Sequence, residues 1–342
     1  MDDIITLDYG SGGKKTSRLI EESILHAFDN PALRALGDGA VLPGGEQLVF
    51  STDSFVVSPL FFPGGDIGKL AVCGTVNDIA MCGGKPLYLS CALILEEGLP
   101  RKNLEKILAS MAEAAKKTGV QIVTGDTKVV EKGRGDGVYI NTAGIGLLRH
   151  PGLGPERIRE GDAVLVSGTV GDHGTAVMLA RNGLAQGEIC SDCAPLNALA
   201  ERLLQAVPET RVLRDPTRGG VATTFNEFVE GRELGIELEE KAVPVRPAVQ
   251  AACELLGLDP LYCANEGKLL AVVPAEKQRR PSEPCAAFPR GKTRRGSALS
   301  RRQRPASSPS ARPLAADGCC KSSPEHSCPE FVSKYPYDIS TR

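Results

Sequence analysis

The sequence predicts a protein of mixed α and β structure with two domains, and three observations support this prediction. The chain has 342 residues, enough for about two domains of ~100–200 residues, each with its own core. Short apolar segments typical of strands alternate with longer segments whose apolar residues recur at helical spacing. The 38 glycines cluster where these segments meet, which suits close approach of the backbone to a ligand. We therefore expect an α/β (α+β) fold.

The predicted elements form two units, separated by a turn-rich segment at residues 150–155. The first domain is predicted to span 1–150 and the second 151–276. In the first domain we expect strands at 47–53, 86–95, 120–126 and 137–148, and helices at 66–82 and 99–118. In the second domain we expect strands at 162–167 and 268–273, and helices at 174–182, 196–207 and 219–230.

The segment 277–342 differs in composition from the rest of the chain. It contains ten Arg, nine Pro and eleven Ser, but its only Leu, Val and Ile residues are Leu299, Leu314, Val332 and Ile339. A segment with so few apolar side chains cannot bury enough surface to offset the entropy lost on ordering it. We therefore expect a disordered tail and an incomplete second domain.

Three interpretations of this tail compete. It is a solvated basic extension, an arginine-rich arm for nucleic acid, or an out-of-frame reading of a GC-rich gene. Nucleic-acid arms usually carry aromatic residues, and Phe288 is the only aromatic residue of the tail before Phe331. The composition changes abruptly after Pro274. We favour the out-of-frame interpretation and expect no binding of nucleic acid.

The N-terminal sequence and the hydropathy pattern predict a cytoplasmic protein. The chain begins with an acidic segment and no long apolar segment follows it, so we expect no signal peptide. No stretch approaches the ~20 apolar residues that span a bilayer, so we expect no membrane contact. The 11 cysteines should then be mostly reduced thiols.

Acidic residues recur where apolar segments meet polar, glycine-rich turns. These residues are Asp53, Asp78, Asp126 and Asp215. Each alone is most simply a helix or turn cap, but Asp78 and its neighbour Asn77 lie inside an otherwise apolar helical segment, where polar groups are costly unless they face a ligand. Carboxylates beside glycine-rich turns suit a divalent cation and the phosphates that it bridges. Together they predict a site for Mg²⁺ and a nucleotide.

The glycine-rich segment near the N-terminus is a candidate phosphate contact. It contains Gly10, Ser11, Gly12 and Gly13. It lacks the Walker A spacing, and the segment 64–69 misses that spacing by one residue. A flexible loop and a phosphate contact therefore stay equally open for residues 10–13. The further candidate cofactor contacts are Lys69, Asn77, Thr127 and Asn141.

Two lysines follow acidic residues closely in the chain. Lys128 comes two residues after Asp126, and Lys268 comes two residues after Glu266. A lysine near metal-bound phosphate acts as a charge contact or, when desolvated, as a proton acceptor, but a plain surface charge is an equal alternative. The single C-x-x-C at 190–193 lacks the second pair of a zinc ribbon, so we expect no thiol-bound metal.

Taken together, these motifs closely resemble the family of the hydrogenase maturation protein HypE. The motifs that carry the resemblance are FSTDS (50–54), PLFFPGG (59–65), TGDTK (124–128), VSGTVGDHG (166–174), RDPTRGG (214–220) and ANEGK (264–268). The resemblance covers about residues 4–276. It implies a two-domain AIR-synthetase-like (PurM-like) fold in which the N-terminal sheets of a homodimer join into a barrel.

The resemblance also implies an activity, cofactors and partners. The family consists of carbamoyl dehydratases that use ATP and Mg²⁺ to supply the cyanide ligands of [NiFe] hydrogenases. A partner carbamoyltransferase, HypF, loads a carbamoyl group onto the family's C-terminal cysteine, and the product passes to an iron scaffold, HypC–HypD. Lys128 and Glu266 match the family positions that take the nitrogen protons. The clustered aspartates would hold Mg²⁺ for phosphoryl transfer.

This sequence departs from the family at its end, where the family finishes on Pro-Arg-Ile-Cys. The last cysteine here, Cys328, lies in an unrelated context, so we expect the chain to lack the acceptor thiol. Two alternatives stay open beside the dehydratase: another small-molecule kinase or synthetase of the superfamily, and an ATP-binding scaffold without catalysis. Selenophosphate synthetase would need a reactive Cys or selenocysteine near residues 10–16, and none is present.

Overall fold

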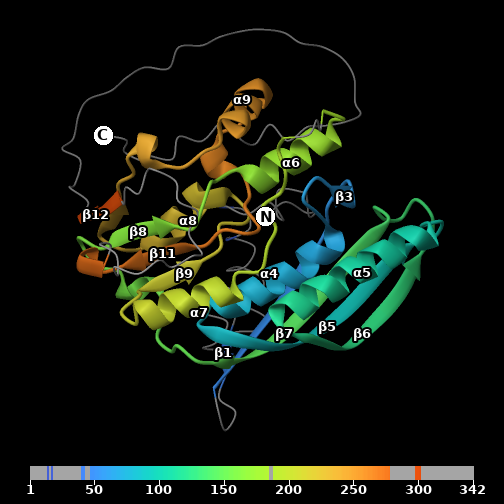
Figure 1. Cartoon of the computed structure of the whole chain (residues 1–342), viewed down its shortest axis with the longest axis horizontal. Coiled ribbons are helices and arrows are strands. Elements are labelled where there is room, and N and C mark those ends of the chain that lie inside the picture. Colours follow the sequence, from blue (N-terminus) through green and yellow to red (C-terminus); the bar gives the residue numbers. More distant parts are fainter. Residues whose placement is uncertain are drawn as a thin grey trace.

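The computed structural model describes residues 14, 17, 40–42, 47–184, 188–277 and 297–301. The described residues form two five-stranded sheets, a two-stranded ribbon and the helices that cover them (Figure 1). One sheet comes from the first half of the chain and the other from the second half. Most of the sequence-predicted functional residues lie on strands, helices or loops of these two halves.

The first sheet has the strand order β1-β2-β7-β5-β6. All neighbouring strands are antiparallel except β5 and β6, which are parallel because helix α5 connects them. The strands are β1 (Ala40–Leu42), β2 (Leu48–Phe55), β5 (Gly84–Glu96), β6 (Gln121–Val130) and β7 (Val138–Leu148), and α5 spans Arg101–Thr118. The four strands and two helices predicted for this half are present, with ends shifted by a few residues.

Helix α4 (Ile67–Met81) runs through the middle of the molecule (Figure 1). It begins at Asp66, whose carboxylate accepts hydrogen bonds from the N–H groups of Gly68 (2.7 Å) and Lys69 (3.0 Å). Thirteen of its 15 residues are buried, as expected for a helix surrounded by protein. It packs on β2, β5, β7 and α5 of the first half and on α7 and β9 of the second. It therefore joins the two halves.

The two faces of the first sheet differ in exposure. One face packs against α4 and α5 in a core that includes Ile67, Ile107 and Met111. The opposite face carries exposed apolar side chains: Phe50 is paired with Ile145, and Ile145 is paired with Tyr88 across neighbouring strands. These side chains are 38%, 39% and 45% exposed, respectively. Within the described residues, this outer face is thus a partly exposed apolar surface of the single chain.

The second sheet has the order β10-β12-β8-β11-β9. Its strands are β8 (Ala163–Val166), β9 (Val212–Arg214), β10 (Leu234–Ile236), β11 (Leu270–Val273) and β12 (Ser297–Arg301). The helices of this half are α6 (Asp172–Arg181), α7 (Asn197–Ala206), α8 (Gly220–Val229) and α9 (Pro247–Leu256). The remaining elements are the ribbon strands β3 (Phe61–Phe62) and β4 (Gly65–Asp66) and the 3₁₀ helices η3 (Pro155–Arg157), η4 (Glu240–Ala242), η5 (Pro260–Tyr262) and η6 (Ala275–Lys277).

The tail departs in one segment from the expectation that it lacks structure. Residues 297–301 form β12, which pairs antiparallel with both β8 and β10. The composition argument counts only apolar side chains, whereas a strand also gains backbone hydrogen bonds from its neighbours in a sheet. The other residues of 278–342 lie outside the described residues.

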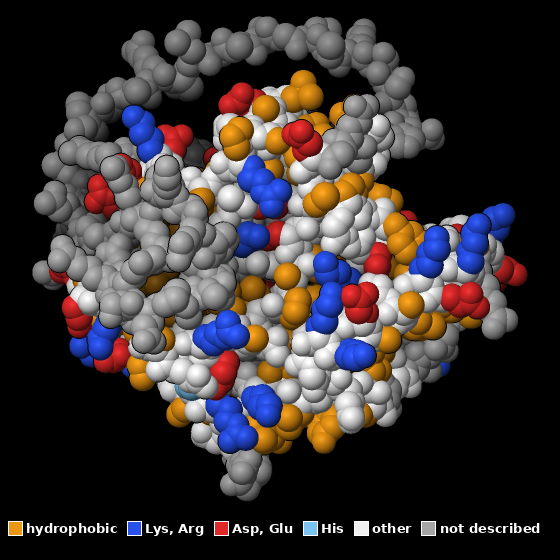
Figure 2. Space-filling view, viewed as in Figure 1, with side chains coloured by type: hydrophobic (Ala, Val, Ile, Leu, Met, Phe, Trp, Pro, Cys, Tyr) orange, Lys and Arg blue, Asp and Glu red, His pale blue; other side chains and the backbone are white. Residues whose placement is uncertain are grey.

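On the face of the molecule shown in Figure 2, basic and acidic side chains are interspersed, with hydrophobic side chains between them. No helix within the described residues is long and apolar enough to cross a membrane. The cysteines that the structure describes are free thiols.

Candidate functional site at the junction of the two halves

Glu266 lies in a loop between η5 and β11 that Asn265 holds in place. The Asn265 side chain is fully buried. Its Oδ1 accepts a hydrogen bond from the Gly171 N–H (2.8 Å), and its Nδ2 donates to the carbonyl oxygens of Pro216 (3.2 Å) and Cys263 (3.1 Å). Because a buried polar group that loses its partners is costly, these bonds fix the backbone on which Glu266 stands.

The Glu266 carboxyl lies among other acidic side chains. Burial raises the pKa of Glu266 well above its usual range, and the nearby carboxylates of Asp215, Asp192 and Asp53 raise it further. Burial also raises the pKa of Asp53, although Arg218 partly offsets this effect. We call Asp53, Asp192, Asp215 and Glu266 the acidic cluster. A carboxyl perturbed by burial and by like charges is a candidate catalytic group.

Asp192 contacts the Glu266 loop from the segment 191–196. Its Oδ1 accepts a hydrogen bond from the Glu266 N–H (3.1 Å), and its Oδ2 forms an ion pair with Lys268 Nζ (3.2 Å). The loop in turn binds back, because the Glu266 carbonyl accepts a hydrogen bond from the Ala194 N–H (3.2 Å). Glu266 and Lys268 are therefore held by the same carboxylate.

Two buried thiols lie beside the acidic cluster. Cys73 comes from α4 and Cys193 from the segment 191–196, and their exposed fractions are 0% and 2%. A hydrogen bond between the two thiols lowers the pKa of Cys73 and raises that of Cys193 well above its usual range. Cys193 of the C-x-x-C sequence thus contacts a cysteine of the first half, whereas Cys190 is exposed.

His173, near the start of α6, supports the segment 191–196 from the second half. Its Nδ1 hydrogen-bonds with Ser191 Oγ (2.8 Å), and its ring packs edge-on against Phe62. Burial lowers the pKa of His173 to about 4, although the Asp192 carboxylate partly opposes this effect. The imidazole is therefore neutral at physiological pH.

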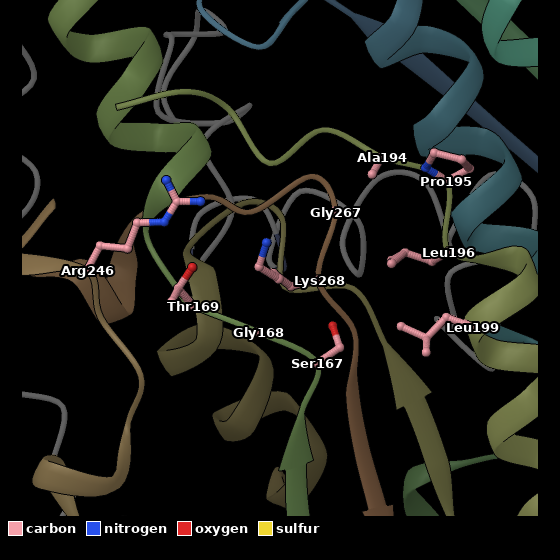
Figure 3. Close-up of a pocket in the computed structure, with 10 residues that line it drawn as sticks. All are labelled: Ser167, Gly168, Thr169, Ala194, Pro195, Leu196, Leu199, Arg246, Gly267 and Lys268. Atoms are coloured by element: carbon pink, nitrogen blue, oxygen red, sulfur yellow. The ribbon is translucent and has the colours of Figure 1, made fainter. Parts of the chain in front are cut away.

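A pocket of about 470 Å³ lies on the Lys268 side of the loop (Figure 3). Lys268 stands in the middle, Arg246 and Thr169 lie on one side, and Leu196 and Leu199 lie on the other. The Arg246 guanidinium and the Thr169 hydroxyl both contact a buried carboxylate, that of the α6 residue Asp172, at 3.1 and 2.6 Å. One wall is therefore cationic and another apolar, which suits a ligand with a charged part and an apolar part.

Glycine 168 allows Lys268 to cross the floor of this pocket. A Cβ atom at Gly168 would lie 2.8 Å from Lys268 Cε, closer than carbon atoms pack. A side chain at this position would therefore displace the Lys268 stem. Gly168, the first of the three glycines in the VSGTVGDHG motif, therefore has a spatial reason that spacing along the chain does not reveal.

The four predicted metal ligands lie in different surroundings. Asp53 and Asp215 belong to the acidic cluster near Glu266. Asp78 lies on α4, and its Oδ2 accepts a hydrogen bond from Ser51 Oγ (2.7 Å). The backbone of Asp126 pairs with Ala92 on β5, but its side chain is outside the description. Among the described residues, no group of three or more His, Cys, Asp or Glu side chains is arranged to hold a metal ion.

Lys128 and Thr127 lie on β6, at one edge of the first sheet. The Lys128 backbone pairs with Ile94, and its side chain is exposed. Thr127 pairs with Leu93, and its side chain is not described. The structure therefore places the two predicted proton acceptors on different elements, Glu266 in the junction and Lys128 on a sheet edge.

The remaining candidate cofactor contacts bind other parts of the protein. Asn77 is fully buried, and its Oδ1 accepts a hydrogen bond from the Leu196 N–H (2.7 Å) while its Nδ2 donates to the Ala194 carbonyl (3.2 Å). Lys69 Nζ donates to the Gly64 carbonyl (2.9 Å). Asn141 Nδ2 donates to the Asp53 carbonyl (3.0 Å). Residues 10–13 lie outside the described residues.

Sequence reasoning missed Asp192 and Arg246 as parts of this region. Asp192 lies inside the C-x-x-C sequence, which drew attention to its thiols. Arg246 lies in a segment for which no element was predicted. Its partner Asp172, at the start of a glycine-rich turn, was a signal for a charged contact that could have been used.

Two family models match the chain: "AIR synthase related protein, N-terminal domain" over residues 36–148 and "AIR synthase related protein, C-terminal domain" over residues 159–284. The carbamoyl dehydratase HypE of Azotobacter vinelandii is 51% identical over 293 residues, covering 84% of this chain and 85% of the relative. A crystal structure of HypE in complex with ATP is 49% identical with a TM-score of 0.70, covering 87% of this chain and 90% of that one. A HypE–HypF complex is 54% identical with a TM-score of 0.72, covering 75% and 85%.

The paired sheets and the junction between them define an AIR synthase-related fold, of the PurM-like type expected from the sequence. Within this class the relatives of high identity share one name. The chain belongs to the HypE family of carbamoyl dehydratases, a family of hydrogenase maturation enzymes.

Proposed function

We propose that the chain is an ATP-dependent carbamoyl dehydratase that converts a protein-bound S-carbamoyl cysteine to a thiocyanate during [NiFe] hydrogenase maturation. The observation that carries this proposal is the Glu266 carboxyl, which is held in a fixed loop and has a raised pKa. Once ionised, a carboxylate with a raised pKa is a stronger base than an ordinary one, and dehydration of an amide needs a base. Membership of the HypE family supports the same activity.

The proposed reaction removes water from R–S–C(=O)NH₂ to give R–S–C≡N. ATP, when bound, phosphorylates the carbamoyl oxygen and so turns it into a leaving group, with ADP and phosphate as products. Glu266 takes a proton from the carbamoyl nitrogen. Lys128, exposed on β6 in the single chain, is the second proposed proton acceptor, a role that requires its amine to be desolvated in the assembled complex.

The junction fits a magnesium nucleotide in its chemistry. Mg²⁺ prefers carboxylate oxygens, and Asp53 and Asp215 supply these beside Glu266. Asp78 and Asp126 complete the proposed ligand set. Arg246 and Lys268 offer the nearby pocket two cationic side chains that suit phosphate oxygens. Of the other candidate contacts, Lys69 and the segment 10–13 are proposed to meet the nucleotide.

The proposed partners and compartment rest on the relatives, on the family resemblance and on the free thiols. One relative crystallised as a HypE–HypF complex, so we propose HypF as the carbamoyl donor. We propose HypC–HypD as the acceptor of the product on the resemblance to the family alone. The free thiols fit a reducing compartment, which we propose is the cytoplasm. We also propose that the first domain ends at residue 150 and the second begins at residue 151.

A first experiment tests the activity with an acceptor supplied in trans. The full chain is mixed with Mg²⁺, ATP and a synthetic peptide ending in Pro-Arg-Ile-Cys whose thiol is carbamoylated. We expect phosphate release that requires the peptide, and a peptide that loses the mass of one water. A matched peptide ending in Ser is the control. ATP binding by calorimetry without any turnover would favour a scaffold, and phosphate release at the same rate with and without the carbamoylated peptide would overturn the proposed dehydration.

We further propose that the chain forms a homodimer through the outer face of the first sheet. Phe50, Tyr88 and Ile145 are exposed there side by side, and apolar surfaces of this kind mark protein interfaces. Ile145→Asp should convert a dimer into a monomer in analytical ultracentrifugation. Leu255→Asp is the control, because Leu255 is 77% exposed on α9. A dimer that persists in Ile145→Asp would place the interface elsewhere.

A further inference from the structure

We propose that Asp192 is a positioning residue for the dehydration, because one of its carboxylate oxygens holds the backbone of Glu266. This inference rests on the proposed function and adds a residue to it. Asp192 does not match a predicted site residue, and neither the family models nor the relatives' names point to it.

The contact between Asp192 and the Glu266 loop is close on both sides. Asp192 Oδ1 lies 3.1 Å from the Glu266 nitrogen and Oδ2 lies 3.2 Å from Lys268 Nζ. The Asp192 side chain is 1% exposed and that of Lys268 is 13% exposed, so water competes little for these bonds. The bond to the backbone N–H does not depend on the rotamer of Glu266. It therefore fixes the point from which the Glu266 side chain extends.

Gly267 makes this approach possible. A Cβ atom at Gly267 would lie 1.8 Å from the Asp192 carbonyl oxygen and 3.0 Å from the Ala194 nitrogen. Any other residue would therefore push the Glu266 loop away from the segment 191–196. The two backbones are packed against each other at the position where the Asp192 carboxylate binds.

Asp192 is itself held from both halves of the molecule. The preceding residue, Ser191, donates its N–H to the Pro63 carbonyl (2.7 Å) and hydrogen-bonds through Oγ with His173 (2.8 Å). Asn77 of α4 binds the same segment further along, at residues 194–196. The position of the Asp192 carboxylate, and with it that of the Glu266 backbone, therefore depends on α4 and α6. A small misplacement of a reacting group lowers the rate strongly, so this support should affect turnover.

The test compares two double variants that differ in a single hydrogen bond. Both variants carry Lys268→Met, which removes the ion pair between residues 268 and 192. In this background an amide at position 192 is not placed beside an ammonium group. Asp192→Asn in this background keeps an oxygen that accepts from the Glu266 N–H, whereas Asp192→Ala removes it. We expect kcat for peptide-dependent phosphate release to be about 10- to 100-fold lower in the Ala variant, with KM for ATP within about twofold between the two.

Equal kcat values in the two variants would overturn the inference, and so would a difference confined to KM. A second measurement does not require catalysis: exchange of the Glu266 amide hydrogen should be faster in the Ala variant than in the Asn variant. Equal exchange at Glu266 would overturn the inference as well. If the unmodified chain releases no phosphate with the peptide, the proposed function fails, and the exchange measurement still decides the role of Asp192. If either variant fails to fold, exchange of the Glu266 amide hydrogen is measured in the unmodified chain. We expect slow exchange there, and exchange at the rate of an unprotected amide would overturn the inference.

Discussion

Replacing Glu266 with glutamine is expected to lower the rate of peptide-dependent phosphate release about 100- to 10,000-fold. Glutamine has nearly the same shape as a protonated glutamate, so the loop held by Asn265 should stay in place. It cannot accept a proton from the carbamoyl nitrogen. Calorimetry should therefore show an affinity for magnesium ATP within about threefold of that of the unmodified chain.

The matched control for this variant is Glu240→Gln. Glu240 is exposed on η4, so its replacement should leave both the rate and the affinity unchanged. If Glu266→Gln loses ATP binding together with turnover, Glu266 contacts the nucleotide or its metal. If Glu266→Gln keeps the full rate, another group takes the nitrogen protons.

The difference in stability between Glu266→Gln and the unmodified chain should depend on pH in a defined direction. Burial and the neighbouring Asp215, Asp192 and Asp53 carboxylates raise the pKa of Glu266 in the folded protein. Between the unfolded and the folded pKa values the folded state holds more protons than the unfolded state, so the free energy of unfolding falls as pH rises. Glutamine does not ionise. Glu266→Gln should therefore match the unmodified chain in acid and exceed its stability above this window, as measured by urea unfolding.

The long elements were predictable because their signals are local. The predicted helix 66–82 is α4 (Ile67–Met81) and the predicted helix 99–118 is α5 (Arg101–Thr118). Each has many apolar residues at helical spacing, and Asp66 provides a cap at the start of α4. Such patterns specify a helix before any tertiary contact forms.

The elements that were missed lack such local signals. Strands β9 (Val212–Arg214) and β10 (Leu234–Ile236) have three residues each, too few to show alternation. They are strands because β11 and β12 supply hydrogen bonds. Tertiary pairing, which the sequence does not display, decided these two strands. Helix α9 (Pro247–Leu256) is an exception, because its sequence is largely apolar, begins with proline and ends at Gly257; these local signals were present and were overlooked.

The candidate site was predictable in part for the same physical reason. Glu266 was found by resemblance, and the structure adds a raised pKa and a fixed loop. The pairing of Cys73 with Cys193 joins the two halves of the chain, and the contact of Asp192 with Glu266 joins residues 74 positions apart within the second half. No spacing rule connects such residues. The metal and nucleotide contacts, including Asp126 and Thr127, stay predictions.

Asn77 shows that a polar residue in an apolar helix can find hydrogen-bond partners within the protein. A polar residue in an apolar helix indicates a ligand, because burial without partners is costly. In the structure its partners are the backbone groups of Leu196 and Ala194. The side chain therefore joins α4 to the segment that carries Asp192. Whether it also contacts a cofactor is a separate question, which its replacement addresses.

Asn77→Ala is expected to lower the free energy of unfolding by about 2–6 kcal/mol, because each of two buried backbone groups loses its partner at about 1–3 kcal/mol. Urea unfolding of the full chain measures this change. The control is Asn182→Ala, since Asn182 is exposed at the end of α6 and its side chain donates to the Met178 carbonyl of the same helix (2.8 Å). That change should stay within about 0.5 kcal/mol.

The same two variants separate a structural Asn77 from one that binds the cofactor. If Asn77 links α4 to the segment 191–196, folded Asn77→Ala should lose more turnover than ATP affinity. The reason is that this segment carries the Asp192 carboxylate, which supports Glu266. A direct cofactor contact predicts the opposite: unchanged unfolding and a large loss of ATP affinity in calorimetry. The second result would return Asn77 to the nucleotide site and leave the junction of the two halves to be held by the packing of α4 on α7 and β9.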